Sequence, residues 1–296
     1  MTSGIPLTAE EKTMPTFTNK ATLSYNGKTT DSNTVTGNYA EALSLTKTAL
    51  DTLYTASDKI TYTVSVINQA TSALTEVTLT DDLGGITFGG GTVYPLSYVE
   101  GTLLYFLNGA LEATPTISSV SPLVIEGLSI PAGGNAIFVY EAQVTEYAPL
   151  DVNGSIINTV TVSSPALISD FTDTETVNTA DAPELSIVKS LCPQTVTENG
   201  TVTYTFDIIN VGNTAAVATD NVTVTDVFDP VLTISSVTVN GTPISSGTGY
   251  TYNSTTGVFE TVAGVITVPA ATYTQNPDGS YNVIPGSTVL KVVGTI

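Results

Sequence analysis

Along most of the chain, hydrophobic and polar residues alternate in short runs that are separated by Asn-Gly, Pro and Gly. Threonine, valine and tyrosine are frequent in these runs, and a period of two places successive side chains on opposite faces of a strand. No helical periodicity extends beyond a single turn. The pattern therefore predicts an all-β protein of short antiparallel strands that pack as sandwiches.

The expected strands fall into three groups. Near the N-terminus, 17–25 and 29–37 flank an Asn-Gly pair at 26 and 27, which favours a tight hairpin turn. The next group is 43–49, 59–68, 73–81, a middle section with Tyr94, Tyr98 and 103–107, then 135–145, 155–163 and a return strand ending at Thr179. The last group is 185–191, 201–210, 221–227, 232–240, 249–252, 258–262 and 287–296.

The two larger groups are copies of one repeat. Leu-Ser-Leu-Thr-Lys ending at Lys47 returns as Leu-Ser-Ile-Val-Lys ending at Lys189, an offset of 142 (189−47). Both copies continue with Thr-Tyr-Thr, then an asparagine, then Val-Thr-x-Thr-Asp ending at Asp81 or Asp226. Repetition over this length indicates tandem domains of one fold. The sequence predicts a leader and hairpin at 1–39, an Ig-like β-sandwich at 40–182 and a second at 183–296.

The second copy lacks the closing hairpin of the first. Asn-Thr-Val-Thr-Val opens that hairpin at Asn158, and the second copy has no counterpart before Ile296. A similar segment, Asn-Lys-Ala-Thr-Leu, begins at Asn19, an offset of 139 (158−19). We expect the N-terminal hairpin to complete a second sandwich, because an open sheet edge readily accepts an added strand.

The donated strand would present one face to the sandwich that receives it. Each large apolar side chain buried there stabilises the complex by roughly 1.5–3 kcal/mol. The hairpin either closes onto its own second sandwich, giving a circularly permuted monomer, or enters that of the next molecule. The second geometry is favoured because the first sandwich intervenes, and such non-closing contacts make filaments. The donor residues are Phe17, Asn19, Ala21, Leu23 and Tyr25.

In both copies a lysine, an aspartate and an asparagine are in phase with the apolar face. One interpretation is an autocatalytic isopeptide bond, in which a desolvated, uncharged lysine attacks the asparagine carboxamide, the aspartate moves the proton and ammonia leaves. The alternative is that the aspartates form turns, the lysines extend to solvent and Asn-Thr is turn chemistry. The sequence leaves both open. The residues are Lys47, Asp81 and Asn158 within the first copy, and Lys189 and Asp226 in the second, with Asn19 from the hairpin.

Composition narrows the classes of function. The chain has 27 acidic residues against 7 lysines, no arginine, no histidine and a net charge of −20. Nucleic acid and anionic membranes would be repelled, so neither is an expected partner. Histidine catalysis and most transition-metal sites are excluded, no calcium-loop spacing occurs, and no cofactor or metal is expected.

Neither an enzyme nor a ligand-binding module is favoured. No phosphate loop, dinucleotide fingerprint or nucleophile elbow is present. An adhesin-like binding module would need exposed aromatic loops, and Tyr94, Tyr98 and Tyr105 fit core positions better. No apolar secretion signal and no apolar stretch of membrane-spanning length occurs. Copies of the chain itself are the expected partners.

The motifs Leu-Ser-x-x-Lys, Thr-Tyr-Thr-x-x-x-x-Asn, Val-Thr-x-Thr-Asp and Asn-Thr-Val-Thr-Val resemble the bacterial conserved repeat called "domain of unknown function 11". That resemblance implies an Ig-like module of cell-surface and spore-surface proteins. Two such modules without a secretion signal resemble subunits of ribbon- or fibre-like appendages on spores of anaerobic spore-formers, which are made in the mother cell. A moved closing hairpin departs from ordinary arrays of the repeat and suits a polymerising subunit.

Overall fold

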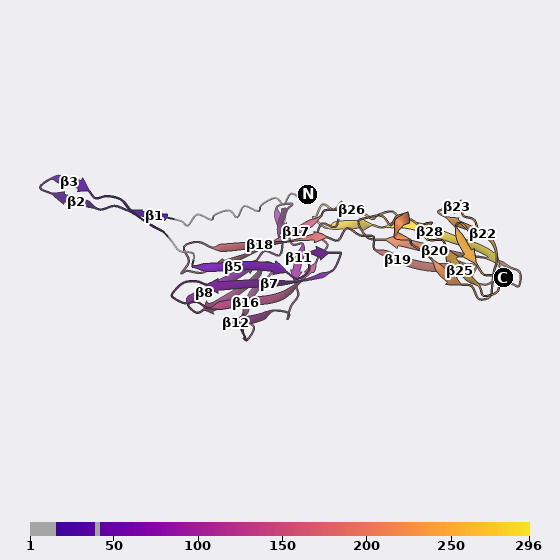
Figure 1. Cartoon of the computed structure of the whole chain (residues 1–296), viewed down its shortest axis with the longest axis horizontal. Helices are drawn as coiled ribbons and strands as arrows, with labels where there is room; N and C mark the ends of the chain where they lie inside the picture. The colour runs from indigo at the N-terminus through magenta and orange to yellow at the C-terminus, as the bar shows by residue number, and fades with distance from the viewer. Residues whose placement is uncertain (1–15, 39–41) are drawn as a thin grey trace, which may run out of the picture.

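The protein is elongated and consists almost wholly of β-strands, in a computed structural model that describes residues 16–38 and 42–296. A hairpin arm lies at one end, a first sandwich-like unit follows, and a second unit occupies the other end (Figure 1). The predicted all-β class is confirmed, with several antiparallel sheets. The predicted leader at 1–15 lies outside the described residues. Within them, no helix is long and apolar enough to cross a bilayer.

The N-terminal hairpin forms at the predicted turn, where Asn26 and Gly27 both have positive φ (45° and 75°) as a type I′ turn requires. The prediction of two continuous strands is wrong, because each strand is interrupted. Ala21 and Ser32 exchange hydrogen bonds that involve the serine hydroxyl, which takes the place of a regular ladder. The outer pair is β1 (Thr16–Asn19) with β4 (Val35–Asn38), and the inner pair is β2 (Thr22–Tyr25) with β3 (Lys28–Asp31).

The first unit has two six-stranded sheets around one core, whose buried hydrophobic residues extend from Leu43 to Val177. One sheet has the order β13-β12-β16-β7-β5, with β11 also paired to β16, and comprises β5 (Leu43–Ala49), β7 (Lys59–Asn68), β11 (Leu96–Tyr98), β12 (Leu104–Leu107), β13 (Ala110–Leu111) and β16 (Asn135–Val144). The other has the order β14-β15-β8-β17-β18-β6 and comprises β6 (Leu53–Tyr54), β8 (Leu74–Asp81), β14 (Thr116–Val120), β15 (Leu123–Ile130), β17 (Ser155–Ser163) and β18 (Phe171–Thr179). A small pair joins β9 (Ile86–Phe88) to β10 (Gly91–Val93).

The second unit has its own core, from Val202 to Val292. Its larger sheet has the order β19-β20-β28-β22-β23 and comprises β19 (Leu185–Cys192), β20 (Thr201–Asn210), β22 (Thr233–Val239), β23 (Thr242–Pro243) and β28 (Gly286–Thr295). The facing sheet has only β21 (Thr225–Val227), β25 (Val258–Thr261) and β24 (Tyr250–Tyr252), beside a 3₁₀ turn η1 (Ala218–Asp220). Strands equivalent to β17 and β18 do not occur among the described residues of this unit.

Equivalent asparagines have the same structural role in both copies. Asn68 and Asn210 are both fully buried. The Asn68 Nδ2 donates to the carbonyl oxygens of Ser72, Ile130 and Pro131 at 2.9–3.0 Å. The Asn210 Nδ2 donates to those of Thr214 and Pro269 at 2.8 and 3.0 Å. The repeat found in the sequence is thus a repeat of structure as well.

Several parts of the fold differ from the predicted strands. Extended pairing over 221–227 is limited to β21, which pairs with β25, whereas its eight-residue counterpart β8 is held by β15 and β17 on its two edges. Strands β14 and β15 of the first unit were not predicted individually. A hairpin of β26 (Thr272–Gln275) and β27 (Tyr281–Ile284) was not predicted either. That hairpin reaches the first unit, where the Tyr281 amide donates to the Glu146 carbonyl at 2.7 Å.

Candidate functional site

The first candidate site lies in the core of the first unit, between its two sheets. Lys47 on β5 is in register with Val64 of β7, and its side chain has no exposed surface. Its Nζ forms an ion pair with Asp81 Oδ2 on β8 of the facing sheet, and lies 4.8 Å from the centre of the Tyr62 ring. The lysine therefore does not extend to solvent. Burial lowers the pKa of Lys47, and attraction to Asp81 opposes that shift.

Asp81 is held by donors on both oxygens. Its Oδ2 accepts from the Tyr140 hydroxyl as well as from Lys47, and its Oδ1 accepts from the Leu83 amide at 2.9 Å. Tyr140 lies on β16, directly opposite Tyr62 of β7, and the two rings stack with centres 6.0 Å apart. Complete burial raises the pKa of Tyr140 well above its ordinary value, so the hydroxyl remains a donor.

Asn158 is fully buried on β17, two positions before Val160, which pairs with Asp81. Side chains two apart on a strand share a face, so Asn158 lies on the face of β17 that carries buried Val160. Neither atom of its carboxamide has a hydrogen-bond partner among the described residues. The Tyr62 hydroxyl is close enough to Asn158 to have its pKa lowered by that contact, against the larger rise that burial causes. A buried carboxamide without partners is rare in native proteins and needs a reason.

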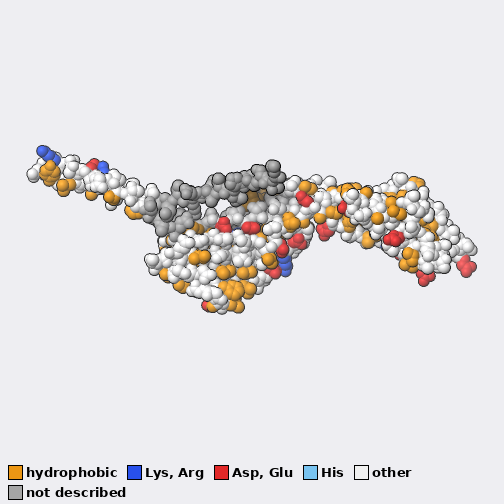
Figure 2. All heavy atoms as spheres, viewed as in Figure 1, with side chains coloured by type: hydrophobic (Ala, Val, Ile, Leu, Met, Phe, Trp, Pro, Cys, Tyr) orange, Lys and Arg blue, Asp and Glu red, His pale blue; other side chains and the backbone are white. Residues whose placement is uncertain are grey.

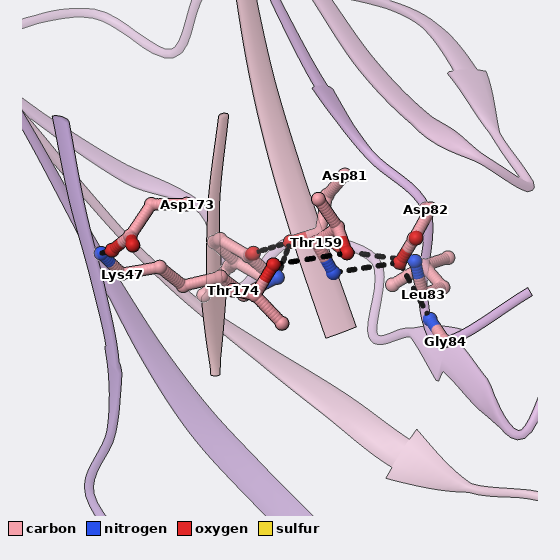
Figure 3. A network of polar contacts seen from close by, with 9 residues as sticks. Lys47, Asp81, Asp82, Leu83, Gly84, Thr159, Asp173 and Thr174 are labelled. Carbon is pink, nitrogen blue, oxygen red and sulfur yellow. Dashed lines mark hydrogen bonds and ion pairs between the residues drawn. The ribbon is translucent and has the colours of Figure 1, made fainter. Parts of the chain in front are cut away.

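Neighbouring polar contacts fix the strands that carry these groups. The Lys47 amide donates to Asp173 Oδ2 of β18 at 2.6 Å, which joins β5 to the closing hairpin (Figure 3). Asp82 Oδ1 accepts from the amides of Thr159 and Gly84 at 2.8 and 2.9 Å (Figure 3). Two of these three bonds, those to Asp173 of β18 and from Thr159 of β17, involve the closing hairpin, so the hairpin helps to set the position of the site.

The second unit contains a similar pair without this closing hairpin. Lys189 Nζ lies 2.5 Å from Asp226 Oδ2, and three aromatic rings surround the ammonium, those of Tyr204, Phe206 and Phe228 at 4.8–5.6 Å. The Lys189 side chain is 42% exposed, whereas that of Lys47 is not exposed at all. No asparagine side chain of the second unit occupies the position of Asn158 in the repeat.

The apolar residues beside the two lysines differ in the same way. Leu43 is fully buried, and its repeat counterpart Leu185 is 39% exposed. Ile187, on the same face of β19, is 53% exposed. In the first unit β18 packs against β5, and among the described residues no strand covers β19 in that way. An apolar face of β19 is therefore exposed beside Lys189.

The predicted donor residues lie on the arm, away from both sites (Figure 1). Phe17, Leu23 and Tyr25 are 46–61% exposed, and Asn19 and Ala21 are exposed too. Asn19 is paired with Val35 in β4, and in this structure it does not meet Lys189 or Asp226. The structure thus pairs Lys47 with Asp81, with Asn158 on the adjacent strand β17, and separately pairs Lys189 with Asp226.

Sequence reasoning missed the two tyrosines of the first site, Tyr62 and Tyr140. The Thr-Tyr-Thr motif contains Tyr62 and was used only as a repeat marker. The repeat does not mark Tyr140, because the second unit has no tyrosine at that place. Tyr140 lies opposite Tyr62, and the residue opposite Tyr204 is Val292. Tyr98 and Tyr105 are core residues, at 6% and 8% exposure. No group of histidine, cysteine and acidic residues suited to a metal ion occurs among the described residues.

Comparisons with known proteins give distant structural similarity. No protein-family model matches the chain, and no curated protein matches it significantly. Three solved structures are a family 123 glycoside hydrolase from Clostridium perfringens (13% identity, TM-score 0.29, 47% of this chain and 27% of that one), the pilus backbone RrgB from Streptococcus pneumoniae (13%, 0.34, 86% and 50%) and the major pilin BcpA of Bacillus cereus (11%, 0.34, 92% and 73%). The chain thus spans half or less of the first two. The chain resembles pilin backbones in this coarse sense, and TM-scores this low carry no argument about function.

Proposed function

We propose that this protein is the structural subunit of a bacterial surface or spore fibre. The N-terminal hairpin of one molecule packs against the exposed apolar face of β19, with Leu185 and Ile187, in the next molecule's second unit. Copies add head to tail. The observation that carries the proposal is the contrast between Leu43, fully buried beneath the closing hairpin, and its repeat counterpart Leu185, 39% exposed. An exposed apolar face of β19 and an exposed apolar hairpin at opposite ends of one molecule favour pairing between copies.

The length of the chain argues against closure onto the same molecule. Asn19 pairs with Val35, and the seven residues from Val35 to Ala42 (42−35) span at most about 25 Å. The hairpin attaches beside Leu43, whereas the link to the second unit leaves beside Tyr54, where the Ala180 amide donates to the Tyr54 carbonyl. Strand β5, seven residues long, separates those points and by itself spans roughly 20 Å at about 3.3 Å per residue. Asn19 would have to pass that junction and continue to Lys189.

The donated strand has the chemistry of the strand it would replace. Asn19, Ala21 and Leu23 stand at the repeat positions of Asn158, Val160 and Val162, all three of which are fully buried in the first unit. Phe17 corresponds to buried Ile156. If the donor strand took the register that β17 has in the first unit, it would bring Asn19 to the Lys189–Asp226 pair. It would also place Leu23 against the apolar side chains of the second unit.

We further propose that both sites form isopeptide bonds. In the first unit, the Lys47 ammonium passes a proton to the Asp81 carboxylate, and the neutral Nζ attacks Cγ of Asn158. The carboxamide Nδ2 takes up one proton from Asp81 and one from the attacking Nζ and leaves as ammonium, which regenerates the Asp81 carboxylate. One C–N bond forms and one breaks, so no oxidant or cofactor is required. Lys189, Asp226 and Asn19 would react in the same way between two molecules, and would join the fibre covalently.

The test is a boiled denaturing gel with intact-mass analysis of the full chain and of a chain lacking Met1 to Asn38. We expect a ladder from the full chain and a single band from the deletion. The monomer band of both should be lighter by one ammonia, from the Lys47–Asn158 bond. A native monomer whose stability depends on its own first 38 residues would instead establish the closed, permuted form and overturn the fibre.

A matched pair of hairpin variants separates docking from covalent linkage. Asn19→Ala removes the proposed reacting carboxamide, and Asn33→Ala removes an exposed carboxamide from the same hairpin. We expect Asn19→Ala to abolish the boiled ladder while large particles persist on native sizing. Asn33→Ala should keep both. A ladder that survives in Asn19→Ala would assign the linkage to another residue.

A further inference from the structure

One difference between the two lysine–aspartate sites is a tyrosine hydroxyl group beside the aspartate. In the first unit the cross-strand pair beside the lysine is Tyr62 with Tyr140. In the second unit Tyr204 stands for Tyr62, at the repeat offset of 142 (204−62), and the residue opposite it is Val292. Both sites keep the lysine, the aspartate and the ring 4.8 Å from the ammonium. Only the first has a second tyrosine.

The Tyr140 hydroxyl contacts the Asp81 oxygen that would receive the lysine proton in the proposed reaction. Tyr140 donates to Asp81 Oδ2, the same oxygen that faces the Lys47 ammonium. In the second unit the corresponding oxygen, Asp226 Oδ2, has no hydrogen-bond donor beyond its ion pair with Lys189. No counterpart of Tyr140 is present, and the other oxygen, Asp226 Oδ1, accepts from the neighbouring Val227 amide at 2.9 Å.

We infer that Tyr140 is a positioning residue for the Lys47–Asn158 bond: it holds the Asp81 carboxylate in the orientation that receives the lysine proton and returns it to the departing nitrogen. This inference rests on the proposed function. Tyr140 touches neither reacting atom, and it acts through Asp81. The titratable groups that face Asp81 are Lys47, Tyr62 and Tyr140, with Asp82 next to it in the chain.

A neighbouring tyrosine provides a matched control. Tyr98 is also buried, its ring lies edge-on to that of Tyr140 with centres 6.4 Å apart, and its hydroxyl has no hydrogen-bond partner among the described residues. Tyr140→Phe and Tyr98→Phe each remove one buried hydroxyl from the same aromatic cluster. Only the first removes a contact to Asp81.

The experiment follows bond formation in the full chain with Asn19→Ala, which silences the second site. Protein is made by cell-free synthesis, and intact mass with peptide mapping gives the rate at which the Lys47–Asn158 cross-link appears. We expect Tyr140→Phe to slow that rate about tenfold to a hundredfold, the loss that slight misplacement of a reacting group produces. Tyr98→Phe should react at the parent rate.

A purely structural role for Tyr140 predicts a different result, because it would slow the reaction only through lost folding stability. Urea unfolding in the Asn158→Ala background gives the stability cost of each hydroxyl without the bond. We expect Tyr140→Phe to react more slowly than Tyr98→Phe even where urea brings the two to the same free energy of unfolding. Equal rates in the parent and in Tyr140→Phe, or a rate that follows stability alone, overturn the inference but keep the bond. A parent chain that never loses ammonia overturns the covalent part of the proposed function, and this inference with it.

Discussion

At the scale of single residues, identical sequence motifs have different environments. Lys47 and Lys189 occupy the same place in the repeat, and each meets an aspartate and a tyrosine ring. The first is buried completely and the second is 42% exposed. A buried lysine is destabilising unless it is paired, so Asp81 stabilises the fold for as long as Lys47 keeps its charge.

The buried pair should be costly to break from one side. In the Asn158→Ala background, which prevents the bond, Lys47→Met leaves Asp81 buried and without its cation. We expect the free energy of unfolding in urea to fall by about 3–5 kcal/mol. The double variant Lys47→Met with Asp81→Leu should recover most of that loss, because two apolar groups then pack together. A double variant no more stable than the single one would contradict this account.

At the scale of elements, two hairpins of related sequence differ in what they contact. The closing hairpin β17–β18 is part of the first core, and the arm β1–β4 is exposed in the monomer. Gly37 lies opposite Phe17, and the phenylalanine ring packs over the glycine. A Cβ at position 37 would lie 2.3 Å from the Phe17 Cζ and would collide with it. The arm thus has a preformed strand pair, so docking would require little further ordering of its backbone.

One truncation in each hairpin should separate stability from assembly. Ile156→Ala removes a buried side chain, and we expect the first unit to lose about 2–5 kcal/mol of unfolding free energy. Leu23→Ala changes a residue that is 61% exposed, so monomer stability should stay within about 0.5 kcal/mol. The same Leu23 change should weaken self-association in sedimentation experiments. Unchanged assembly by Leu23→Ala would remove this residue from the proposed interface.

At the scale of the whole molecule, charge is unevenly distributed. The arm at 16–38 has two lysines and one aspartate, a net charge of +1 (2−1), while 183–296 has two lysines and eight acidic residues, a net charge of −6 (2−8). Basic side chains are visible on the arm, and acidic ones on the units (Figure 2). Opposite charge on the two proposed partners would attract them before contact.

Assembly should therefore depend on salt. We expect the initial rate of polymer growth, followed by light scattering, to fall as sodium chloride rises from low to high ionic strength, because screening shortens the range of the attraction. Lys28→Glu, at the exposed tip of the arm, should slow growth at low salt and lose its effect at high salt. A rate that rises with salt would indicate that repulsion between acidic units dominates instead.

Alkaline pH should destabilise the first unit. Burial raises the pKa values of Tyr54, Tyr62 and Tyr140 above the ordinary value of 10.0. In the unfolded chain these groups ionise near pH 10, so their contribution to stability is present below that pH and is lost above it. The lowered pKa of Lys47 has the opposite effect, because it makes stability rise with pH below pH 10.5. Only one lysine contributes in this way, against three tyrosines.

The measurement is urea unfolding at pH 9 and pH 11. We expect lower stability at pH 11, and a smaller decrease in Tyr54→Phe than in the parent. Tyr25→Phe is the control, because Tyr25 is 54% exposed and should not alter the pH dependence. An equal decrease in Tyr54→Phe and the parent would show that Tyr54 does not contribute.

Local pattern was enough to predict much of this protein. Alternation predicted most strands to within a residue or two, and Asn-Gly at 26 and 27 predicted the arm's turn. Repeat spacing located Lys47, Asp81 and Asn158 on strands with their side chains in phase with the core. Alternation did not predict the local hairpin β26–β27, and it predicted a strand at 221–224, where the neighbouring strands that hold β8 on its two edges have no counterpart among the described residues.

The sequence by itself therefore determined the strands, the repeat and the residue types at each site, because these follow from side-chain periodicity and spacing. Only the tertiary structure decided which of the repeated residues are buried. Leu43 and Leu185 have the same local sequence, and the presence of β17–β18 over one of them buries it. Tyr140 reaches Asp81 for the same reason, since two sheets distant in sequence must pack face to face before that hydrogen bond exists.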